Sequence, residues 1–483
     1  MISEKPREYC GLCGCTGSEG ILDLTHLGLH SLQHRGQEAA GVMAAFDGTC
    51  HLHKGAGLVD EVFATLPAAW RKATISHAIS HVRYSTAGAS TVVNAQPLMA
   101  NINGEFVGVA HNGTICNAGT LRSELQAEGA IFQTTTDTEL VLHLMARCLH
   151  RHNHDYREAL VEALGRLKGA FCLLLLSKGR MTAVRDPLGF RPLCLGRFKD
   201  GGWMVASESI ALSVAGAEYV REVEPGEIIF WEKDGSMVSR RFAESPRRAH
   251  CIFEHVYFAR PGSYVFGDSV YEVRKAMGRR LAIESPADVD VVMPVPDSGT
   301  YAALGYAEQS GVPFDMGLSR NHYVGRTFID PGLSSRRKLV QRKMQPIVEA
   351  LKGKRICLIE DSIVRGSTSK ARIHTLREAG AREIHMRVTC PPHRHGCYFG
   401  IDFPDREKLM ANKVGGTGAE FLAEMARQLQ LDSLAYLSQE GMLSCVTAHP
   451  AKDYCCACFD GEYPVIPDVM NAAPIVEDNA GRA

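Results

Sequence analysis

Two adjacent carboxylates, Glu360 and Asp361, directly follow an apolar run at residues 356–359. Such a run is typical of a buried strand in a parallel sheet. Small residues at 366–369 come next and precede a helical stretch at about 370–379. Ligands of open α/β sheets bind at the carboxyl ends of the strands, and free N–H groups before a helix suit a phosphate. Adjacent carboxylates suit Mg²⁺ and ribose hydroxyls, so the spacing predicts a site for a phosphorylated ribose.

The loop that follows these carboxylates is not a Walker A loop, because no G-x-x-x-x-G-K-[ST] occurs in the sequence. The simplest alternative is an ordinary strand–turn–helix without a ligand. Two carboxylates at the end of a buried strand are costly unless a ligand or solvent receives them. We therefore favour the binding site.

Cysteines are the second group of residues that could do chemistry, and the chain has sixteen. In a reducing compartment, clustered cysteines indicate metal binding or catalysis rather than disulfides. The pair Cys455 and Cys458 has the C-x-x-C spacing of a zinc or iron–sulfur site. The other clustered cysteines are Cys10, Cys13, Cys15 and Cys456.

The composition of the whole chain limits its partners. Its 483 residues predict two to four domains, and a net charge of −1 offers no electrostatic case for nucleic acid or an anionic membrane. No apolar run approaches the roughly 18 residues that span a bilayer. The polar first nine residues lack the apolar core of a secretory signal. We therefore expect a cytoplasmic protein.

The elements that must position these residues differ between the two halves. Up to about residue 240 the chain is rich in strands, with helices predicted at 137–149 and 156–167, which indicates an α+β domain. The second half alternates strands at 289–295, 356–359 and 383–388 with helices, which indicates a parallel α/β sheet. The residues after about 460 are rich in Pro, Ala, Asn and Gly and predict a flexible tail.

Four polar clusters in the first half, at residues 29–38, 81–88, 110–117 and 134–140, follow Cys10. Together with R-D-P-L-G-F-R-P-L (185–193) and V-A-S-E-S (205–209) they closely resemble the class II glutamine amidotransferase domain, an N-terminal-nucleophile hydrolase. The resemblance implies that Cys10 attacks the glutamine amide and that Asn112 and Gly113 form the oxyanion hole. It also implies that four residues bind glutamine: Arg35, Gly36, Arg83 and Asp137.

The nucleophile of that family uses its own α-amine as the base, and Cys10 has none as translated. The resemblance therefore implies a propeptide, residues 1–9, that is removed at the Tyr9–Cys10 bond by an acyl shift through Cys10. Relatives with a propeptide often have glutamate where this chain has Tyr9. Cys13 is the alternative nucleophile, but it would need a different cut.

The second half resembles glutamine phosphoribosylpyrophosphate amidotransferases through V-P-D-S-G-T (295–300), R-N-H-Y-V-G-R-T-F-I (320–329), E-D-S-I-V-R-G-S-T-S (360–369) and E-H-V-Y-F-A-R-P (254–261). The resemblance covers roughly residues 10–460 and implies a type I phosphoribosyltransferase domain that binds phosphoribosyl pyrophosphate (PRPP). It implies that Ser298, Glu360 and Asp361 hold Mg²⁺, although this family more often has two aspartates. The implied PRPP-binding residues are Arg326, Lys343, Glu360, Asp361, Arg365, Gly366, Ser367, Thr368 and Ser369.

One branch of this family carries a [4Fe–4S] cluster, and the resemblance adds Cys251 and Cys397 to Cys455 and Cys458 as its ligands. Zinc, or no metal at all, remains the alternative. The implied domains are 1–9 as propeptide, 10–240 as glutaminase, 241–460 as phosphoribosyltransferase with the cluster segment, and 461–483 as tail.

The implied reaction hydrolyses glutamine and passes ammonia to C1 of PRPP, which gives 5-phosphoribosylamine at the first step of purine biosynthesis. Val324, Phe328 and Ile329 are candidate walls of an ammonia passage. The family implies a homotetramer that purine nucleotides inhibit. Two alternatives stay open, a PRPP-sensing regulatory protein and an amidotransferase with another acceptor. Cys10 argues against the first and the 360–369 loop against the second.

Overall fold

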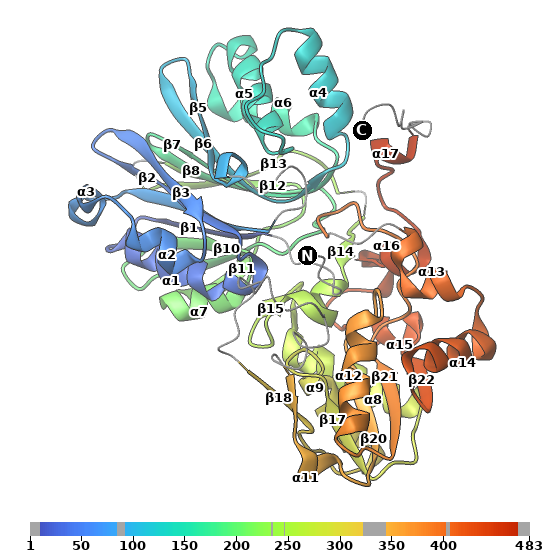
Figure 1. The fold of residues 1–483 in the computed structure, drawn as a ribbon. Helices are drawn as coiled ribbons and strands as arrows, with labels where there is room; N and C mark the ends of the chain where they lie inside the picture. The colour runs from blue at the N-terminus through green and yellow to red at the C-terminus, as the bar shows by residue number, and fades with distance from the viewer. Residues whose placement is uncertain are drawn as a thin grey trace, which may run out of the picture. The chain divides into compact units, whose positions relative to one another are not determined.

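In the computed structural model of this chain, the described residues are 10–84, 92–232, 235–245, 247–321, 344–401 and 406–471. They fall into two compact units (Figure 1). Among the described residues, 10–250, 397–401 and 463–471 belong to the N-terminal unit, and 251–396 and 406–462 belong to the C-terminal unit.

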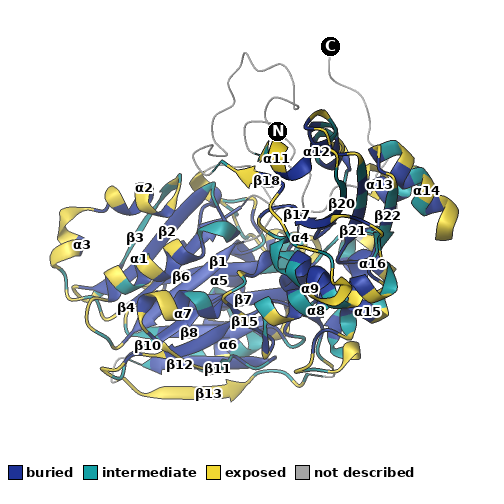
Figure 2. Ribbon diagram, turned by 90° about the horizontal axis from the view of Figure 1, so that it is seen from below, coloured by how far each residue is buried: buried dark blue, intermediate teal, exposed yellow. Residues whose placement is uncertain are grey.

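The N-terminal unit contains two antiparallel sheets. The first has the spatial order β11 (Glu218–Glu222), β9 (Cys194–Arg197), β10 (Trp203–Ala206), β1 (Gly11–Thr16), β4 (His77–Arg83), β2 (Ala39–Phe46) and β3 (Thr49–Ala56). The second has the order β13 (Met237–Arg241), β12 (Glu227–Glu232), β8 (Arg180–Arg185), β7 (Gly169–Ser177), β6 (Glu105–Ile115) and β5 (Leu98–Ile102). Figure 2 shows the central strands buried and the edge strand β13 exposed.

Three apolar cores hold this unit together as a four-layer sandwich. Leu12 and Ile79 of the first sheet meet Leu174 and Ile229 of the second in a core between the sheets. On the outer face of the first sheet lie α1 (Ile21–Ser31), α2 (Val59–Ala64), α3 (Ala68–Lys72) and α7 (Ser209–Ala215). The outer face of the second sheet carries α4 (Ala118–Ala127), α5 (Glu139–Arg151) and α6 (Tyr156–Gly165).

Strand β1 shows how the sequence sets this arrangement. Side chains of a strand alternate between its two faces. Leu12 therefore joins the core between the sheets, whereas Cys13 and Cys15 join the core under the helices. Both faces of β1 are buried, which fixes the position of Cys10 at its start.

The C-terminal unit is built on a parallel sheet with the order β17 (Val291–Pro294), β20 (Arg355–Glu360), β21 (Glu383–Val388) and β22 (Ser433–Tyr436). Helices α8 (Val270–Glu284), α9 (Thr300–Ser310), α12 (Ser367–Glu378) and α14 (Gly418–Leu429) accompany these strands (Figure 1). The pairs β15 (Tyr264–Val265) with β16 (Asp268–Ser269), and β18 (Leu318–Arg320) with β19 (Met344–Pro346), form two small antiparallel ribbons. The remaining short elements include β14 (His250–Cys251), β23 (Tyr454–Cys455), α11 (Val348–Leu351), α13 (Met410–Val414), α15 (Gln439–Leu443), α16 (Ala457–Asp460) and α17 (Asp468–Asn471).

The predicted fold class, an α+β first half and a parallel α/β second half, is confirmed. One boundary differs at the phosphate loop. Helix α12 begins at Ser367, with Gly366 before it at φ +81°, so residues 367–369 form the first helical turn and not a loop. Their N–H groups then belong to the first turn of a helix, where an N–H group has no carbonyl partner within the helix itself.

Candidate functional site

Cys10 lies immediately before β1 and is 8% exposed. Burial raises the pKa of its thiol to about 11. A hydrogen bond with the backbone of Tyr84 and the charges of Arg83 and Arg191 act in the opposite direction, while Asp137 raises the pKa further. The thiol is therefore protonated at neutral pH and needs a base to become a nucleophile.

Two arginines predicted to bind glutamine occupy different environments. Arg83 ends β4 and is 4% exposed. Arg35 is buried, and its Nε donates a hydrogen bond to the buried carboxylate of Glu208. His34 Nε2 contacts the same carboxylate oxygen at 2.6 Å, so Glu208 holds the segment around Arg35 in place.

The next residue, Gly36, packs directly on β4. A Cβ atom there would come within 2.7 Å of the backbone of Arg83, so the two predicted glutamine-binding segments touch. This contact leaves no room for a side chain at Gly36.

Asn112 and Gly113, the predicted oxyanion residues, lie near the end of β6. Gly113 has φ +144°, and a Cβ atom there would lie 2.1 Å from the carbonyl oxygen of Ala170. Only glycine fits this backbone. Asn112 is fully buried, and its Nδ2 donates a hydrogen bond of 3.4 Å to Ser207 Oγ.

Ser207 connects this amide to the nucleophile strand. Its Oγ accepts a hydrogen bond from Leu12 N at 2.9 Å, and its own N–H donates to Leu12 O at 3.0 Å. One hydroxyl thus fixes both the start of β1 and the side chain of Asn112. Ser207 belongs to the V-A-S-E-S segment at 205–209, and the family resemblance implies no role for it.

Asp137, the predicted partner of the substrate ammonium, lies just before α5. Burial favours its protonated form, but His111 and the N–H of Ile115 outweigh burial and lower the pKa of the carboxyl. Ile115 N donates to Oδ2 at 2.8 Å, and His111 Nδ1 lies 3.6 Å from Oδ1. Asp137 is therefore an ionised carboxylate suited to binding an ammonium group.

In the C-terminal unit, Asp361 follows β20 and is 1% exposed. Its Oδ2 accepts a hydrogen bond from Ser298 Oγ, and its Oδ1 accepts one from Ser362 Oγ at 2.6 Å. Two of the three predicted Mg²⁺ ligands, Ser298 and Asp361, thus lie within contact distance.

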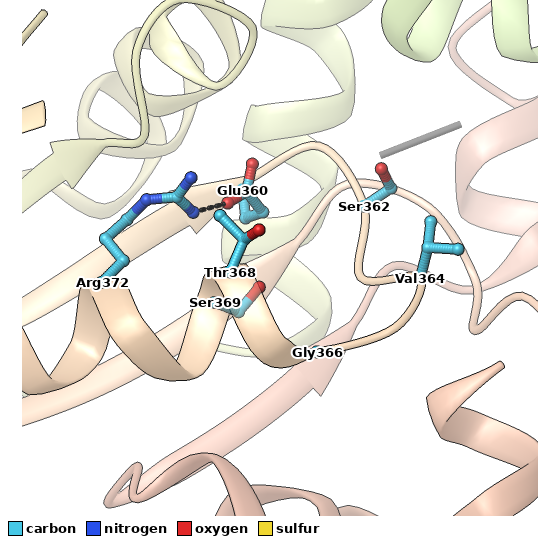
Figure 3. Close-up of a pocket in the computed structure, with 7 residues that line it drawn as sticks. All are labelled: Glu360, Ser362, Val364, Gly366, Thr368, Ser369 and Arg372. Atoms are coloured by element: carbon cyan, nitrogen blue, oxygen red, sulfur yellow. Dashed lines mark hydrogen bonds and ion pairs between the residues drawn. The ribbon is translucent and has the colours of Figure 1, made fainter. Parts of the chain in front are cut away.

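Glu360, the third predicted ligand, is fully buried and forms an ion pair with Arg372 of α12. Figure 3 shows Arg372 reaching from the helix to the end of β20. This contact was not predicted, because a single arginine in a helix carries no sequence signal for a partner twelve residues earlier.

A small pocket opens beside this ion pair, with about 240 Å³ of space including open solvent at its mouth. It is lined by Glu360, Ser362, Val364, Gly366, Thr368, Ser369 and Arg372 (Figure 3). The pocket combines helix N-terminal N–H groups, three hydroxyls and a guanidinium, which are donors suited to a phosphate.

Several predicted residues lie outside the described part of the chain. They are the propeptide residues 1–9, the PRPP-binding residues Arg326 and Lys343, and the passage residues Val324, Phe328 and Ile329.

The four predicted cluster cysteines divide between the units, with Cys251, Cys455 and Cys458 in the C-terminal unit and Cys397 in the N-terminal unit. Ile252 N donates to Cys455 O at 3.4 Å, which brings the backbones next to Cys251 and Cys455 together. Cys397 Sγ accepts an N–H bond from Phe399 at 3.4 Å, an interaction suited to a thiolate. Among the described residues, no group of three or more His, Cys, Asp or Glu side chains is placed to hold a metal ion.

Within the same residues, no helix is long and apolar enough to cross a membrane.

Comparison with known proteins adds independent evidence. A profile described as a glutamine amidotransferase domain matches residues 81–214. The chain is 46% identical over 473 residues to the chloroplastic amidophosphoribosyltransferase of Vigna aconitifolia, which covers 97% of this chain and 94% of that protein. It is 42% identical over 482 residues to the amidophosphoribosyltransferase of Synechocystis sp., with 99% and 95% covered.

Two solved structures match nearly the whole chain. Glutamine PRPP amidotransferase from B. subtilis, complexed with ADP and GMP, is 41% identical with a TM-score of 0.85, covering 94% of this chain and 97% of that one. A structure described as the allosteric regulatory enzyme of purine biosynthesis is 40% identical with a TM-score of 0.86, covering 96% and 100%.

Proposed function

This chain belongs to the amidophosphoribosyltransferase family, and from that premise we propose how its two sites divide the reaction. The enzyme is a glutamine-dependent amidophosphoribosyltransferase of purine biosynthesis. It releases ammonia from glutamine and transfers it to C1 of PRPP, giving 5-phosphoribosylamine, glutamate and pyrophosphate. The assignment of glutamine hydrolysis to the first site rests on the surroundings of Cys10, because the charges of both Arg83 and Asp137 act on its thiol.

The charges around Cys10 match the two charged groups of an amino-acid substrate. Arg83 would pair with the α-carboxylate of glutamine, and ionised Asp137 would pair with its α-ammonium. The glutamine side chain would then lie along the thiol. Asn112 Nδ2 and the N–H of Gly113 would donate hydrogen bonds to the oxyanion that forms when sulfur attacks the amide carbon.

The reaction at Cys10 needs a base and then an acid. The free α-amine of Cys10 would take the thiol proton, the thiolate would add to the amide carbon, and the resulting α-ammonium would return a proton to the departing ammonia. Water then hydrolyses the thioester to glutamate and restores the thiol. This sequence requires cleavage of the Tyr9–Cys10 bond, which would remove residues 1–9. An active enzyme whose intact mass retains these residues would contradict it.

The transferase reaction would take place at the end of β20. Residues 365–369 would bind the 5-phosphate of PRPP, and the carboxylates at 360–361 would bind the ribose hydroxyls, with Arg326 and Lys343 near the pyrophosphate. Ammonia adds to C1 as the C1–O bond to pyrophosphate breaks, and the new ammonium centre loses a proton. Val324, Phe328 and Ile329 would wall the passage that carries the ammonia.

Mg²⁺ fits the oxygen donors of Ser298 and Asp361, which are hydrogen-bonded to each other next to the C-terminal end of β20. Glu360 would contribute its charge to this ion while remaining paired with Arg372. When bound, Mg²⁺ neutralises charge on the pyrophosphate as it leaves.

The division of the reaction is tested by measuring PRPP consumption with glutamine and with ammonium as nitrogen donor. Cys10→Ser is expected to lose glutamine-dependent activity by at least 10³-fold and to keep ammonium-dependent activity, because only glutamine hydrolysis uses the thiol. Cys13→Ala is the matched control, since this neighbouring thiol lies in the core under the helices. Equal loss of both activities in Cys10→Ser would contradict the proposal.

A [4Fe–4S] cluster held by Cys251, Cys397, Cys455 and Cys458 is part of the same proposal. Four thiolates are a donor set for such a cluster. The hydrogen bond from Ile252 N to Cys455 O supports bringing Cys251 close to Cys455, and Cys458 is only three positions further along the chain. We assign the cluster a structural role. The test is iron and acid-labile sulfide analysis with an absorption spectrum, and stoichiometric zinc without iron would refute it.

Regulation, assembly and location complete the proposal. The B. subtilis relative is complexed with ADP and GMP, which supports inhibition of this enzyme by purine nucleotides. We propose a homotetramer that acts in the cytoplasm. Analytical ultracentrifugation with and without GMP, and fractionation of cells, test these points.

A further inference from the structure

Residues 397–401 belong to the second half of the sequence but pack with the N-terminal unit. The described chain leaves the C-terminal unit after Gly396 and is again part of it from residue 406. Between these points, Cys397, Tyr398, Phe399, Gly400 and Ile401 are part of the N-terminal unit. We call residues 397–401 the crossing segment.

The crossing segment touches the strand that carries the proposed oxyanion residues. Gly400 has φ +105°, and a Cβ atom there would lie 3.1 Å from Cα and 3.4 Å from the carbonyl carbon of Gly113. The two backbones are therefore in direct contact. Cys116 Sγ, three residues after Gly113, donates to Tyr398 O at 3.3 Å.

Aromatic rings anchor the crossing segment on either side of this contact. Phe399 stacks on the buried ring of Phe190, with centroids 4.3 Å apart and planes 21° from parallel. Tyr463 meets Tyr398 edge to face at 5.2 Å and also meets Phe399 at 6.1 Å. Such ring pairs stabilise a contact beyond the apolar area that they bury.

A second piece of the C-terminal sequence fixes the same region. Asp468 N donates to Cys116 O at 3.1 Å, and its Oδ2 accepts from Thr120 N at 3.2 Å at the start of α4. The carbonyl of Cys116 and the backbone of Gly113 are thus both held by residues that lie more than 280 positions further along the chain.

The position of Gly113 matters because its N–H can help only if it points at the developing oxyanion. A donor of this kind acts in the transition state and contributes little to substrate binding. The Ala170 carbonyl of β7 also constrains Gly113, because a Cβ atom on Gly113 would lie 2.1 Å from its oxygen. Gly113 therefore contacts both strand β7 and Gly400, and a shift of either neighbour would move its N–H.

We propose that the crossing segment is a positioning element of the glutaminase site, in which Gly400 supports Gly113 in the conformation that binds the oxyanion. This inference rests on the proposed function of Asn112 and Gly113. It assigns part of the glutamine-hydrolysing site to the half of the sequence that carries the PRPP loop.

The test is Gly400→Ala, which would place a methyl group against Gly113. We expect kcat for glutamine hydrolysis to fall at least tenfold, with KM for glutamine and ammonium-dependent activity within twofold of wild type. Alkylation of Cys10 by iodoacetamide, read by peptide mass spectrometry, should proceed at the wild-type rate because it uses no oxyanion hole. A role in folding alone would not give this split between kcat and KM.

Gly201→Ala is the matched control. Gly201 is in the same unit and has a similar φ of +94°, but no atom of another described residue, apart from its two chain neighbours, lies within 4 Å of the position of its Cβ. Alanine there imposes a similar backbone strain without a clash. Its glutaminase activity should stay within twofold of wild type.

Phe399→Leu provides a second readout should Gly400→Ala fail to accumulate as folded protein. It keeps an apolar side chain of somewhat smaller volume and removes the ring stack on Phe190, so kcat for glutamine should fall about two- to fivefold, again with unchanged KM. Wild-type glutaminase activity in the variants that fold would overturn the inference. An equal loss of glutamine-dependent and ammonium-dependent activity in Phe399→Leu would also overturn it. If Cys10→Ser retains glutamine-dependent activity, the proposed function itself fails; if only Gly400→Ala and Phe399→Leu are silent, the inference alone fails.

Discussion

The thiol of Cys10 is buried and lies near charged side chains, and the sum of these effects on its pKa leaves it protonated at neutral pH. Burial raises its pKa to about 11 even though Arg83 and Arg191 favour the thiolate. In the full sequence Cys10 follows Tyr9, so its nitrogen belongs to a peptide bond until the chain is cut there. The proposed α-amine, with a reference pKa of about 7.7–8.0, would supply the missing base after cleavage.

This balance predicts two different pH profiles for alkylation of Cys10 by iodoacetamide. Below a pKa of about 11, each fall of one pH unit lowers the thiolate fraction about tenfold. For protein whose intact mass shows that it still carries residues 1–9, the alkylation rate should rise through pH 7–10 without a plateau. In cleaved enzyme it should level off near pH 8. Identical profiles before and after cleavage would rule out activation by the α-amine.

Ser207 is the second residue-scale determinant, because its hydroxyl fixes both Leu12 and Asn112. Ser207→Ala should lower kcat for glutamine by about tenfold, less than the 10²–10³-fold loss of an oxyanion donor itself, since the amide of Asn112 is only freed to rotate. Ammonium-dependent activity should not change. Ser207→Thr, which keeps the hydroxyl, should recover part of the rate, and no recovery would favour simple loss of packing.

At the scale of elements, strand β20 and helix α12 together make the phosphate pocket. The strand brings two carboxylates to its end, and the helix begins at Ser367 with its N–H groups toward the same end. The buried pair of Glu360 and Arg372 ties the two elements together. Such a pair can add little net stability, yet breaking it leaves an uncompensated buried charge.

Arg372→Met is therefore expected to cost about 3–5 kcal/mol of stability in the C-terminal unit and to raise KM for PRPP in the ammonium-dependent assay. The double variant Glu360→Gln with Arg372→Met should recover most of the lost stability but not the affinity for PRPP. Calorimetry and steady-state kinetics measure these two effects. A double variant no more stable than the single one would show that the charge is not the cause.

The other end of β20 offers a matched control. Arg355 forms ion pairs with Asp288 and Asp290 that are open to solvent. Exposed pairs of this kind add little to stability because water screens them, so Arg355→Met should change stability far less than Arg372→Met.

At the scale of the whole molecule, the two proposed chemistries lie in two different compact units. The N-terminal unit holds Cys10 and its partners, and the C-terminal unit holds the 360–369 site. Saturating ammonium should consequently bypass defects in the first site but not in the second.

This separation predicts opposite behaviour for two carboxylate variants. Asp137→Asn should lose glutamine-dependent activity by about 10²-fold and regain full PRPP consumption with ammonium, because only glutamine needs a partner for its α-ammonium. Asp361→Asn should lose activity with either donor. Rescue of Asp361→Asn by ammonium would contradict its place in the PRPP site.

The sequence by itself determined the kinds of chemistry and much of the fold. The apolar run before Glu360 and Asp361 predicted a parallel strand, which β20 confirms. The helix predicted at 156–167 and the strand predicted at 383–388 correspond to α6 and β21. These predictions succeeded because hydrophobic periodicity and turn residues are local properties of the chain.

Only the tertiary structure decided which side chains share a contact. It paired Glu360 with Arg372, joined Ser207 to Asn112 across 95 positions, and placed Gly400 against Gly113. It also assigned residues 397–401 and 463–471 to the N-terminal unit, although the sequence placed them in a transferase domain and a tail. Contacts between residues so far apart depend on how whole sheets and helices pack, and no local pattern of residue types records that packing.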